Sequence, residues 1–277
     1  MFHNHFKADL HCHSSCSDGT LTPKELIDLA ADVGLKGLAI TDHDTIDAYK
    51  SIVDYSKQKG IEIISGVEFS CVHRKKSIHI LGYSFSLQNK PLAAYCEQHK
   101  ERRIQRYRKI LNLLSKSRMP LTEEEILDIT QAASIGRPHI AMAMVKKGFV
   151  STIEEAFKRF LGEGKPCYVK GDAFPVQETI NIIHNAGGLA VIAHPHLIKN
   201  AIIVRELLEM NFDGIECFYS RFDKASNSHW VEIAKQKKWL ITGGSDFHGS
   251  VKRHIQLGCS WVDEGTFHHL KQVYLSA

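Results

Sequence analysis

The sequence predicts an α/β fold in the size class of a β/α barrel. The chain has 277 residues, enough for one such domain or for one domain that carries a sizeable insert. Short apolar runs alternate along it with segments of helical periodicity, which is the pattern of βαβ units. Histidines and carboxylates also follow directly after several of these runs. Because active sites of parallel barrels form at the carboxyl ends of the strands, these positions bear on function as well as on fold.

Eight short apolar runs are predicted to be strands. They are Ala8–Leu10, Gly37–Thr41, Glu62–Ser65, Ser77–Tyr83, Leu189–Ala193, Gly214–Phe218, Leu240–Thr242 and Gln256–Val262. Continuous apolar runs of this length are typical of strands buried on both faces, as in a parallel sheet or barrel.

Local signals mark where several helices begin and end. In Thr22-Pro23-Lys24-Glu25 a capping residue is followed by a proline at the first helical position and by a capping-box glutamate. The capping-box spacing recurs at residues 122–125 and 151–154. A further helix begins near Pro175 and ends at Gly187-Gly188.

The alternation of strands and helices lapses between about residues 86 and 169. Four successive helices are predicted there, at Pro91–Ser117, Glu123–Ala132, Arg137–Lys147 and Ile153–Leu161. We therefore predict a barrel formed by residues 1–85 and 170–277, and a helical insert at 86–169 that serves as a substrate-binding cap.

Composition excludes several classes of protein. With 43% apolar and 24% charged residues the chain is neither disordered nor collagen-like, and no run approaches the ~20 apolar residues of a membrane span. Seven cysteines without a C-x-x-C pair predict reduced thiols and a cytoplasmic location. A net charge of +4 is too small to indicate nucleic-acid binding by itself. The 17 histidines make metal chemistry the first hypothesis, because histidine is the commonest metal ligand.

Several segments place histidines or carboxylates within or just after predicted strands. They are Asp9-Leu10-His11-Cys12-His13 with Asp18-Gly19, Thr41-Asp42-His43-Asp44, Gly66-Val67-Glu68, His79, His194-Pro195 and Ser245-Asp246-Phe247-His248. The carboxyl ends of parallel strands meet on one face of a barrel, so these segments are expected to meet at one mouth. His11 and His13 point to the same side of an extended strand, so both can bind one metal. Imidazole and carboxylate ligands together suit Zn, Mn or Fe and do not choose among them.

This set of motifs resembles the polymerase and histidinol phosphatase (PHP) family of metal-dependent phosphoesterases. The motifs span residues 9–248, which is nearly the whole chain. The resemblance implies a distorted (β/α)7 barrel and two to three divalent metal ions (Mn, Fe or Zn). The insert, with Glu101-Arg102-Arg103 and Gly136-Arg137-Pro138-His139, resembles that of one subgroup. Members of this subgroup remove a phosphate from nucleoside 3′,5′-bisphosphates, and some also trim the 5′ ends of RNA.

The same resemblance implies which residues hold the metals. The first ion would be bound by His11, His13, Glu68 and Asp246, the second by Asp18, His43 and His248, and the third by His79 and His194 with Glu68 bridging. A metal-bound hydroxide shared by two ions would be the nucleophile. Asp9 and Asp42, beside the ligands, are expected to accept hydrogen bonds from imidazole N–H groups.

Basic residues of the insert are predicted to bind substrate. Arg102, Arg103 and Arg106 lie on one predicted helix, and guanidinium groups bind phosphate oxygens in a bidentate manner. The alternative is the solvated basic face of an amphipathic helix. Arg137 and His139 are also predicted substrate contacts, with capping of the following helix as the alternative.

We therefore expect a hydrolase that removes the 3′-phosphate of nucleoside 3′,5′-bisphosphates. His196 is a candidate general acid for the leaving group, the alternative being a surface histidine. Three other functions remain open: a 5′-to-3′ exonuclease acting on short RNA, a histidinol-phosphatase-like enzyme and a non-catalytic metal-binding PHP module. The expected partner is a small phosphorylated nucleotide or short RNA, and neither a membrane nor an obligate protein partner is expected.

Overall fold

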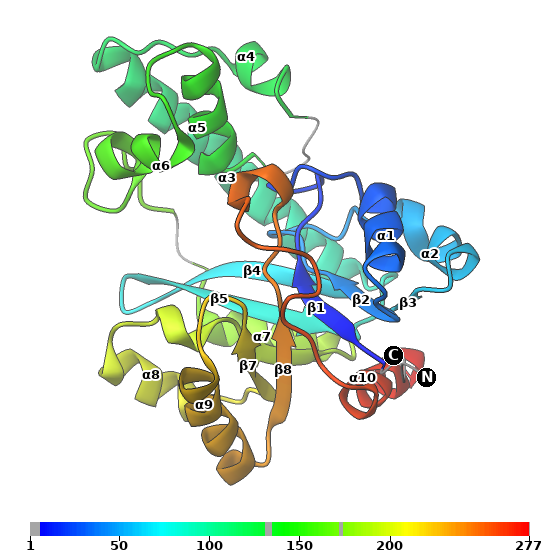
Figure 1. Cartoon of the computed structure of the whole chain (residues 1–277). Coiled ribbons are helices and arrows are strands. Elements are labelled where there is room, and N and C mark those ends of the chain that lie inside the picture. Colours follow the sequence, from blue (N-terminus) through cyan, green and yellow to red (C-terminus); the bar gives the residue numbers. More distant parts are fainter. Residues whose placement is uncertain (1–5, 131–134, 172–173, 277) are drawn as a thin grey trace.

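The computed structural model describes residues 6–130, 135–171 and 174–276, and it shows an α/β fold with two adjoining sheets at its centre (Figure 1). The first sheet contains β1 (Ala8–Cys12), β2 (Gly37–Ile40) and β3 (Glu62–Ile63), all parallel. The second has the order β4 (Gly66–His73), β5 (Lys76–Tyr83), β6 (Leu189–Ile192), β7 (Gly214–Tyr219) and β8 (Leu240–Gly244). In it β5 runs antiparallel to both neighbours, whereas β6, β7 and β8 are parallel to one another.

Backbone hydrogen bonds connect the two sheets at their edges. The N–H of Asp246, which follows β8, donates to the carbonyl of His11 in β1 at 2.7 Å. The N–H of Glu68 in β4 donates to the carbonyl of Asp42, which follows β2, at 3.2 Å. The described strands nevertheless form two sheets and not one closed sheet. The α/β class is therefore confirmed, but a continuous (β/α)7 cylinder of strands is not found.

The antiparallel direction of β5 explains why a residue inside a strand joins residues that follow other strands. The middle of β5 lies beside the carboxyl end of β6: Ile80 pairs with Ile192, and the carbonyl of His79 accepts a hydrogen bond from the N–H of Ala193 at 3.2 Å. His194 follows Ala193 directly. His79 therefore reaches the same edge as the residues that follow the parallel strands.

Helices cover the outside of the sheets (Figure 1). They are α1 (Pro23–Asp32), α2 (Tyr49–Gln58), α7 (Val176–Asn185), α8 (Ala201–Leu208), α9 (Lys224–Lys237) and α10 (Glu264–Ser276), with short 3₁₀ turns at Pro195–Leu197 and Gly249–Lys252. The predicted capping box of α1 is present, because the Thr22 hydroxyl accepts from the N–H of Glu25 and the Glu25 carboxylate accepts from the N–H of Thr22 at 2.8 Å. Apolar side chains on the inner faces of these helices pack against the strands.

The segment predicted as an insert forms a separate lobe of helices (Figure 1). It contains α3 (Lys90–Lys116), α4 (Glu123–Leu127), α5 (Arg137–Lys146), α6 (Ile153–Ala156) and a π-helical turn (Phe157–Leu161). Near the start of α3, Leu92 and Tyr95 pack into the core of the second sheet, whereas Ile110 and Leu114 pack into a core of the lobe itself. One helix of 27 residues thus belongs to both cores and sets the position of the lobe.

One predicted strand was wrong in type, and one predicted helix was wrong in extent. Residues 256–262 form no strand, and only Val262 pairs with β1, opposite Ala8. The reason lies at Gly258, whose φ of +76° is incompatible with an extended strand and whose N–H donates to the Asp9 carboxylate at 2.8 Å. The helix predicted at Glu123–Ala132 ends at Leu127, and Ala132 itself lies outside the described residues.

Among the described residues, no helix combines the length and the apolar character that crossing a membrane requires. All seven cysteines are unpaired, as the sequence predicted.

Gly244 allows β8 to approach β1 closely beside the histidines that follow. A Cβ at this position would lie 2.3 Å from the backbone nitrogen of His11 and 2.4 Å from its Cβ. We expect Gly244→Ala to lower the free energy of unfolding by about 1–3 kcal/mol, the usual cost of overpacking a tight contact. Urea denaturation measures this change.

Gly265→Ala is the matched control for this variant. A Cβ there would meet nothing closer than 3.7 Å, and the position lies in α10. Its free energy of unfolding should stay unchanged or rise, since alanine is the better helix former. Equal stability of the two variants would contradict the close approach of β8 to β1.

Candidate metal centre and basic cleft

Nine side chains that the sequence singled out lie together at the edge where the two sheets meet. They are His11 in β1, His13 and Asp18 in the following loop, His43 after β2, Glu68 in β4, His79 in β5, His194 after β6, and Asp246 and His248 after β8. Potential ligand atoms of eight of them form three overlapping groups, within each of which all atoms lie within 4.8 Å of one another. The ninth, His194, contacts Glu68 at 2.9 Å. The structure thus brings all nine together, and their role as metal ligands remains a prediction.

The group formed by His11, His13, Glu68 and Asp246 has the spacing of a tetrahedral metal site. The Nε2 atoms of His11 and His13 lie 3.4 and 3.2 Å from Glu68 Oε2, and 3.5 and 3.3 Å from Asp246 Oδ1. Ligand atoms about 2.0–2.1 Å from one tetrahedral ion are separated by roughly 3.4 Å. The four atoms therefore surround a point that an ion of this kind would fit.

Buried ring nitrogens without hydrogen-bond partners support the same conclusion. Within the described part of the chain, Nε2 of His11, Nε2 of His13 and Nδ1 of His43 are buried and form no hydrogen bond. Because a buried polar atom without a partner is costly, these atoms indicate a group that the protein atoms alone do not supply. A divalent cation is such a group.

The second group contains Asp18, His43 and His248, with His13 at its side. Nε2 of His248 lies 3.4 Å from Asp18 Oδ1, and Nε2 of His43 lies 3.9 Å from Asp18 Oδ2. Burial lowers the pKa of His43 to about 3 and also lowers the pKa of His248. Both imidazoles are therefore neutral at physiological pH, which is the form that binds metals.

Glu68 lies at the centre of the arrangement. Its Oε1 contacts Nδ1 of His79 at 2.7 Å and Nε2 of His194 at 2.9 Å, while its Oε2 faces His11, His13 and His43. Burial favours the neutral acid, but the surrounding imidazoles outweigh burial and hold the pKa of Glu68 well below its usual range. The two oxygens of this carboxylate thus face different groups of histidines, as a bridging ligand would.

Residues around the nine hold their side chains in orientation. Glu216, buried in β7, contacts Nδ1 of His11 at 2.8 Å. The hydroxyl of Tyr219 donates to Asp246 Oδ2 at 2.7 Å, and Lys252 contacts the same oxygen at 2.6 Å, which leaves Oδ1 facing the histidines. No motif of the sequence marks Tyr219 or Lys252, although a glutamate within the apolar run Gly214–Phe218 was a signal for Glu216.

The expectation that Asp9 and Asp42 orient imidazoles was wrong. Asp42 accepts hydrogen bonds from the backbone N–H of Ser14 at 2.8 Å and from the hydroxyl of Ser17 at 2.6 Å. Asp9 accepts from the backbone N–H of Ser245 at 2.9 Å. Both carboxylates therefore hold the loops that carry the candidate ligands, because loop N–H groups must be satisfied when they are buried.

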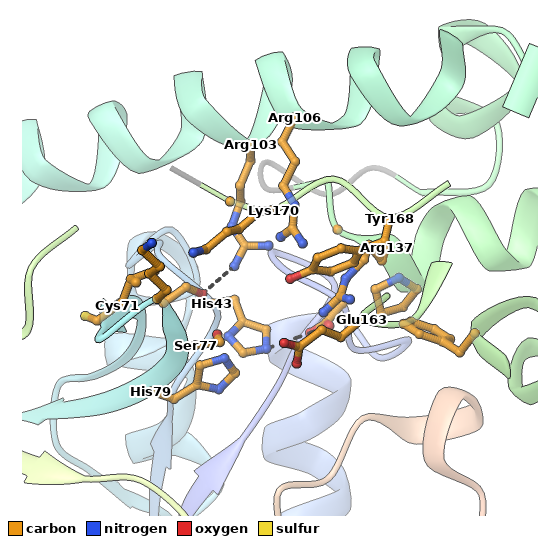
Figure 2. A pocket seen from close by; sticks show the side chains of 18 residues that line it. His43, Cys71, Ser77, His79, Arg103, Arg106, Arg137, Glu163, Tyr168 and Lys170 are labelled. Carbon is orange, nitrogen blue, oxygen red and sulfur yellow. Dashed lines mark hydrogen bonds and ion pairs between the residues drawn. The ribbon is translucent and has the colours of Figure 1, made fainter. Parts of the chain in front are cut away.

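A basic cleft of about 190 Å³ opens beside the candidate ligands, between the β4–β5 hairpin and the helical lobe (Figure 2). Its lining includes the candidate ligands Asp18, His43 and His79 and five cationic residues, Lys75, Arg103, Arg106, Arg137 and Lys170. Three of the five predicted substrate contacts thus line this cleft. The lysines were missed, because neither belongs to a motif that the sequence marks.

The other two predicted substrate contacts do not line this cleft. The Arg102 guanidinium lies 3.8 Å from the centre of the Phe174 ring. His139 is buried, and its Nδ1 accepts a hydrogen bond from the N–H of Gly136 at 3.0 Å, so it caps helix α5 as the alternative reading proposed.

Backbone carbonyls hold the guanidinium groups of Arg106 and Arg137 in the cleft, and the buried Asp44 carboxylate holds that of Arg103. Arg106 donates to the carbonyl of Val169 at 2.8 Å, and Arg137 donates to that of Leu161 at 3.2 Å. Burial, together with the charges of Arg137 and Arg103, lowers the pKa of Arg106 to about 10. Cations that repel one another in a partly buried cleft would be stabilised by a bound anion.

Asp44 connects this cleft to the candidate metal centre. It follows His43 directly, and its Oδ2 accepts from Nε of Arg103 at 2.6 Å while its Oδ1 lies 3.1 Å from Nδ1 of His99. Arg103 also donates to the hydroxyl of Ser70 at 2.9 Å. Helix α3 is thereby fixed to the loop that carries His43.

The candidate general acid His196 lies outside the cleft. Its ring stacks on Phe222 with centroids 4.8 Å apart and lies 6.0 Å from the ring of Tyr219. Burial lowers the pKa of His196 to about 4, so its imidazole is neutral at pH 7 and has no proton to give as an imidazolium. The position and charge of this side chain therefore argue against the role of a general acid.

Similar proteins cover nearly the whole chain. A 5′-3′ exoribonuclease from Haemophilus influenzae is 34% identical over 94% of this chain and 93% of its own length. A 3′,5′-nucleoside bisphosphate phosphatase from Chromobacterium violaceum is 31% identical, covering 87% and 86%. A phosphoribosyl 1,2-cyclic phosphate 1,2-diphosphodiesterase from Eggerthella lenta is 29% identical, covering 90% and 97%. The crystal structure of a protein from Bifidobacterium adolescentis, assigned as a metal-dependent phosphoesterase, matches with a TM-score of 0.88 and 28% identity over 96% of each chain.

These relatives share one class of chemistry, and the chain is accordingly a metal-dependent phosphoesterase and a hydrolase. The family model of the PHP domain matches residues 9–239, so the chain belongs to the PHP family, as its motifs predicted. The alternative of a non-catalytic module is thereby set aside.

We expect the affinity of the centre for Mn²⁺ to rise with pH between 6 and 9. Burial opposes the charged form of His13, but Asp246, Glu68 and Asp18 outweigh it and raise the pKa of this imidazole to about 9. The proton on this imidazole persists at pH 7 and competes with the metal ion. Raising the pH removes the proton, so the affinity for Mn²⁺ should rise by up to about tenfold per pH unit for each proton released on binding. Titration calorimetry in buffers of different ionisation enthalpy measures both affinity and proton release.

His184, which pairs with Asp213 away from the centre, provides the control. His184→Gln should keep the pH dependence, and His13→Gln should weaken binding and flatten it. An affinity that does not change with pH in the unaltered protein would show that His13 is not a ligand.

We expect Asp44→Asn to raise the KM for a phosphorylated substrate with little change in metal content. The substitution removes the charge that holds Arg103, and hydrogen bonds between charged groups contribute about 1.5–3 kcal/mol, which corresponds to roughly ten- to a hundredfold. Steady-state kinetics and metal analysis of the purified variant measure the two effects. Asp47→Asn, in the same loop but paired with the exposed Lys50, should change neither. A fall in kcat at constant KM would instead indicate a role at the metal centre.

Proposed function

We propose that the protein removes the 3′-phosphate of nucleoside 3′,5′-bisphosphates with the help of two to three divalent ions. The observation that carries this proposal is the position of the basic cleft, which shares His43, His79 and Asp18 with the candidate metal centre. A substrate with two phosphates can then place one at the centre and the other in the cleft. The relative from Chromobacterium violaceum, a 3′,5′-nucleoside bisphosphate phosphatase, supports this choice.

The nine candidate ligands would hold the ions in the assignment that the family motifs imply. Divalent ions bound here would polarise phosphoryl oxygens and lower the pKa of a coordinated water. Three carboxylates, from Asp18, Glu68 and Asp246, belong to these groups, so three divalent ions bound there would leave a positive centre suited to a phosphate dianion. We also propose that the two sheets are the halves of a distorted (β/α)7 barrel, which the backbone hydrogen bonds at their edges support.

The chain's own residues orient the substrate. Arg103, Arg106 and Arg137 face the cleft while neighbouring oxygens fix their side chains, so a phosphate meets donors that are already in place (Figure 2). Lys75 and Lys170 add charge at the walls. At about 190 Å³ the cleft is smaller than the usual 300–1,000 Å³ of sites for whole small molecules, which suits a phosphate group.

A second candidate function is 5′-to-3′ exonuclease activity on short RNA. The relative from Haemophilus influenzae, a 5′-3′ exoribonuclease at 34% identity, favours it. The basic cleft would then bind the 5′-terminal phosphate of the RNA. The two functions require the same metal centre and the same anion seat.

We expect adenosine 3′,5′-bisphosphate to have a higher kcat/KM than adenosine 3′-monophosphate. The second phosphate gains charge-assisted hydrogen bonds in the cleft, which contribute about 1.5–3 kcal/mol, or one to two decades of selectivity. The double variant Arg106→Ala/Arg137→Ala should lose this preference while it retains slow hydrolysis of an aryl phosphate. Release of inorganic phosphate measures all three rates.

Arg108→Ala is the control, because this exposed arginine lies on the same helix and pairs with Glu123 away from the cleft. It should keep the full preference. Equal kcat/KM values for the bisphosphate and the monophosphate in the unaltered protein would contradict the proposal that the cleft binds a second phosphate.

A further inference from the structure

The candidate ligand Asp246 offers only one of its two oxygens to the histidines beside it. Its Oδ1 lies 3.5 Å from Nε2 of His11 and 3.3 Å from Nε2 of His13. Its Oδ2 accepts a hydrogen bond from the hydroxyl of Tyr219 at 2.7 Å and another from Nζ of Lys252 at 2.6 Å. Each oxygen of a carboxylate has two lone pairs, so these two donors fully occupy Oδ2.

The other carboxylate of the same group is restricted in a similar way. The first group of candidate ligands consists of His11, His13, Glu68 and Asp246. Oε2 of Glu68 faces His11 and His13, while its Oε1 contacts His79 at 2.7 Å and His194 at 2.9 Å. Neither carboxylate can bind one ion through both oxygens unless it first gives up these contacts. The first group thus provides two imidazoles and two single carboxylate oxygens.

The turn that carries Lys252 is fixed to the loop that follows β1. This turn spans Gly249–Lys252, and the N–H of Ser250 donates to the hydroxyl of Thr20 at 3.0 Å. Gly249 has a φ of +63°, and a Cβ at this position would lie 2.1 Å from the same hydroxyl oxygen. The side chain of Lys252 is only 29% exposed. The fold therefore determines where this ammonium group lies.

A lysine in this position does not serve the affinity of a cation site. Its positive charge repels any divalent ion that Asp246 binds. Together with the Tyr219 hydroxyl, however, it prevents the carboxylate from turning its second oxygen toward an ion. Ions differ in how much they need that oxygen. Zn²⁺ is commonly held by four ligands, imidazoles among them, whereas Mn²⁺ suits octahedral sites rich in carboxylate and water oxygens.

We propose that Lys252 is a positioning residue that restricts Asp246 to one oxygen and thereby shifts the first group toward Zn²⁺ and away from Mn²⁺. The inference rests on the metal centre of the proposed function, but not on its substrate. The charge of Lys252 does not discriminate between the two ions, because both are divalent. The discrimination comes from the second oxygen, which Mn²⁺ would use and Zn²⁺ would not.

The test measures the affinities of the full chain for Zn²⁺ and for Mn²⁺ by competition with a chelator. In Lys252→Met both affinities should rise, because a repelling charge is lost. The affinity for Mn²⁺ should rise by about tenfold more than that for Zn²⁺, the scale on which residues behind a metal ligand act. The ratio of the two affinities therefore isolates the effect of the second oxygen from that of the charge.

Two further variants serve as controls. Lys252→Arg keeps both the charge and the N–H donors, so it should restore the ratio of the unaltered protein. Arg253→Met removes one positive charge from the next residue of the chain, which is exposed, and should leave the ratio unchanged. A lysine that only stabilised the turn would affect unfolding and not this ratio.

Tyr219→Phe tests the same oxygen without a change in charge. It removes the other donor to Oδ2, so it should also weaken the preference for Zn²⁺, whether or not Lys252→Met folds. The visible spectrum of bound Co²⁺ gives an independent readout, since four-coordinate Co²⁺ absorbs more strongly than six-coordinate Co²⁺. The absorption per bound ion should be lower in Lys252→Met than in the unaltered protein.

The outcomes separate this inference from the proposed function. Equal rises of the two affinities in Lys252→Met, or an unchanged Co²⁺ spectrum, would overturn the inference and leave the metal centre intact. A change of the ratio in Arg253→Met as large as in Lys252→Met would also overturn it. If the unaltered protein binds neither ion, the proposed metal centre fails and the inference falls with it.

Discussion

The structure depends on one buried carboxylate and the imidazoles around it. Glu68 projects from β4 into a cluster of five histidine rings, contributed by both sheets: His11, His13, His43, His79 and His194. Burying a carboxylate of this kind is unfavourable unless polar or oppositely charged groups surround it closely. The strands that carry these histidines therefore meet at this edge, and backbone hydrogen bonds between the sheets, such as that of Asp246 with His11, lie beside the same side chains.

The helical lobe is connected to this centre by electrostatics as well as by packing. Helix α3 enters the core of the second sheet at one end and the core of the lobe at the other, so it acts as a rigid link. Asp44 then joins Arg103 and His99 of this helix to the loop that carries His43. The basic cleft and the candidate ligands are thus held at a defined separation, as the proposed recognition of a substrate with two phosphates would require.

The candidate metal centre and the neighbouring basic cleft concentrate charges of opposite sign. Negative carboxylates converge at the candidate metal centre, and mutually repelling guanidinium groups converge in the neighbouring cleft. Cations at the first and an anion in the second would relieve both repulsions.

Much of this could be predicted from the sequence, because the signals are local. The residue types next to strand ends, the two-residue spacing of His11 and His13, and the capping boxes are set within a few positions, and they indicated the α/β class, the family and the nine residues that converge. Contacts between distant segments could not be predicted in this way. Glu216 reaches His11 across 205 positions, and Lys252 reaches a carboxylate that faces the same histidines. The antiparallel direction of β5 and the placement of the arginines likewise follow from how the sheets and the lobe pack, and packing depends on the whole chain and not on any one segment.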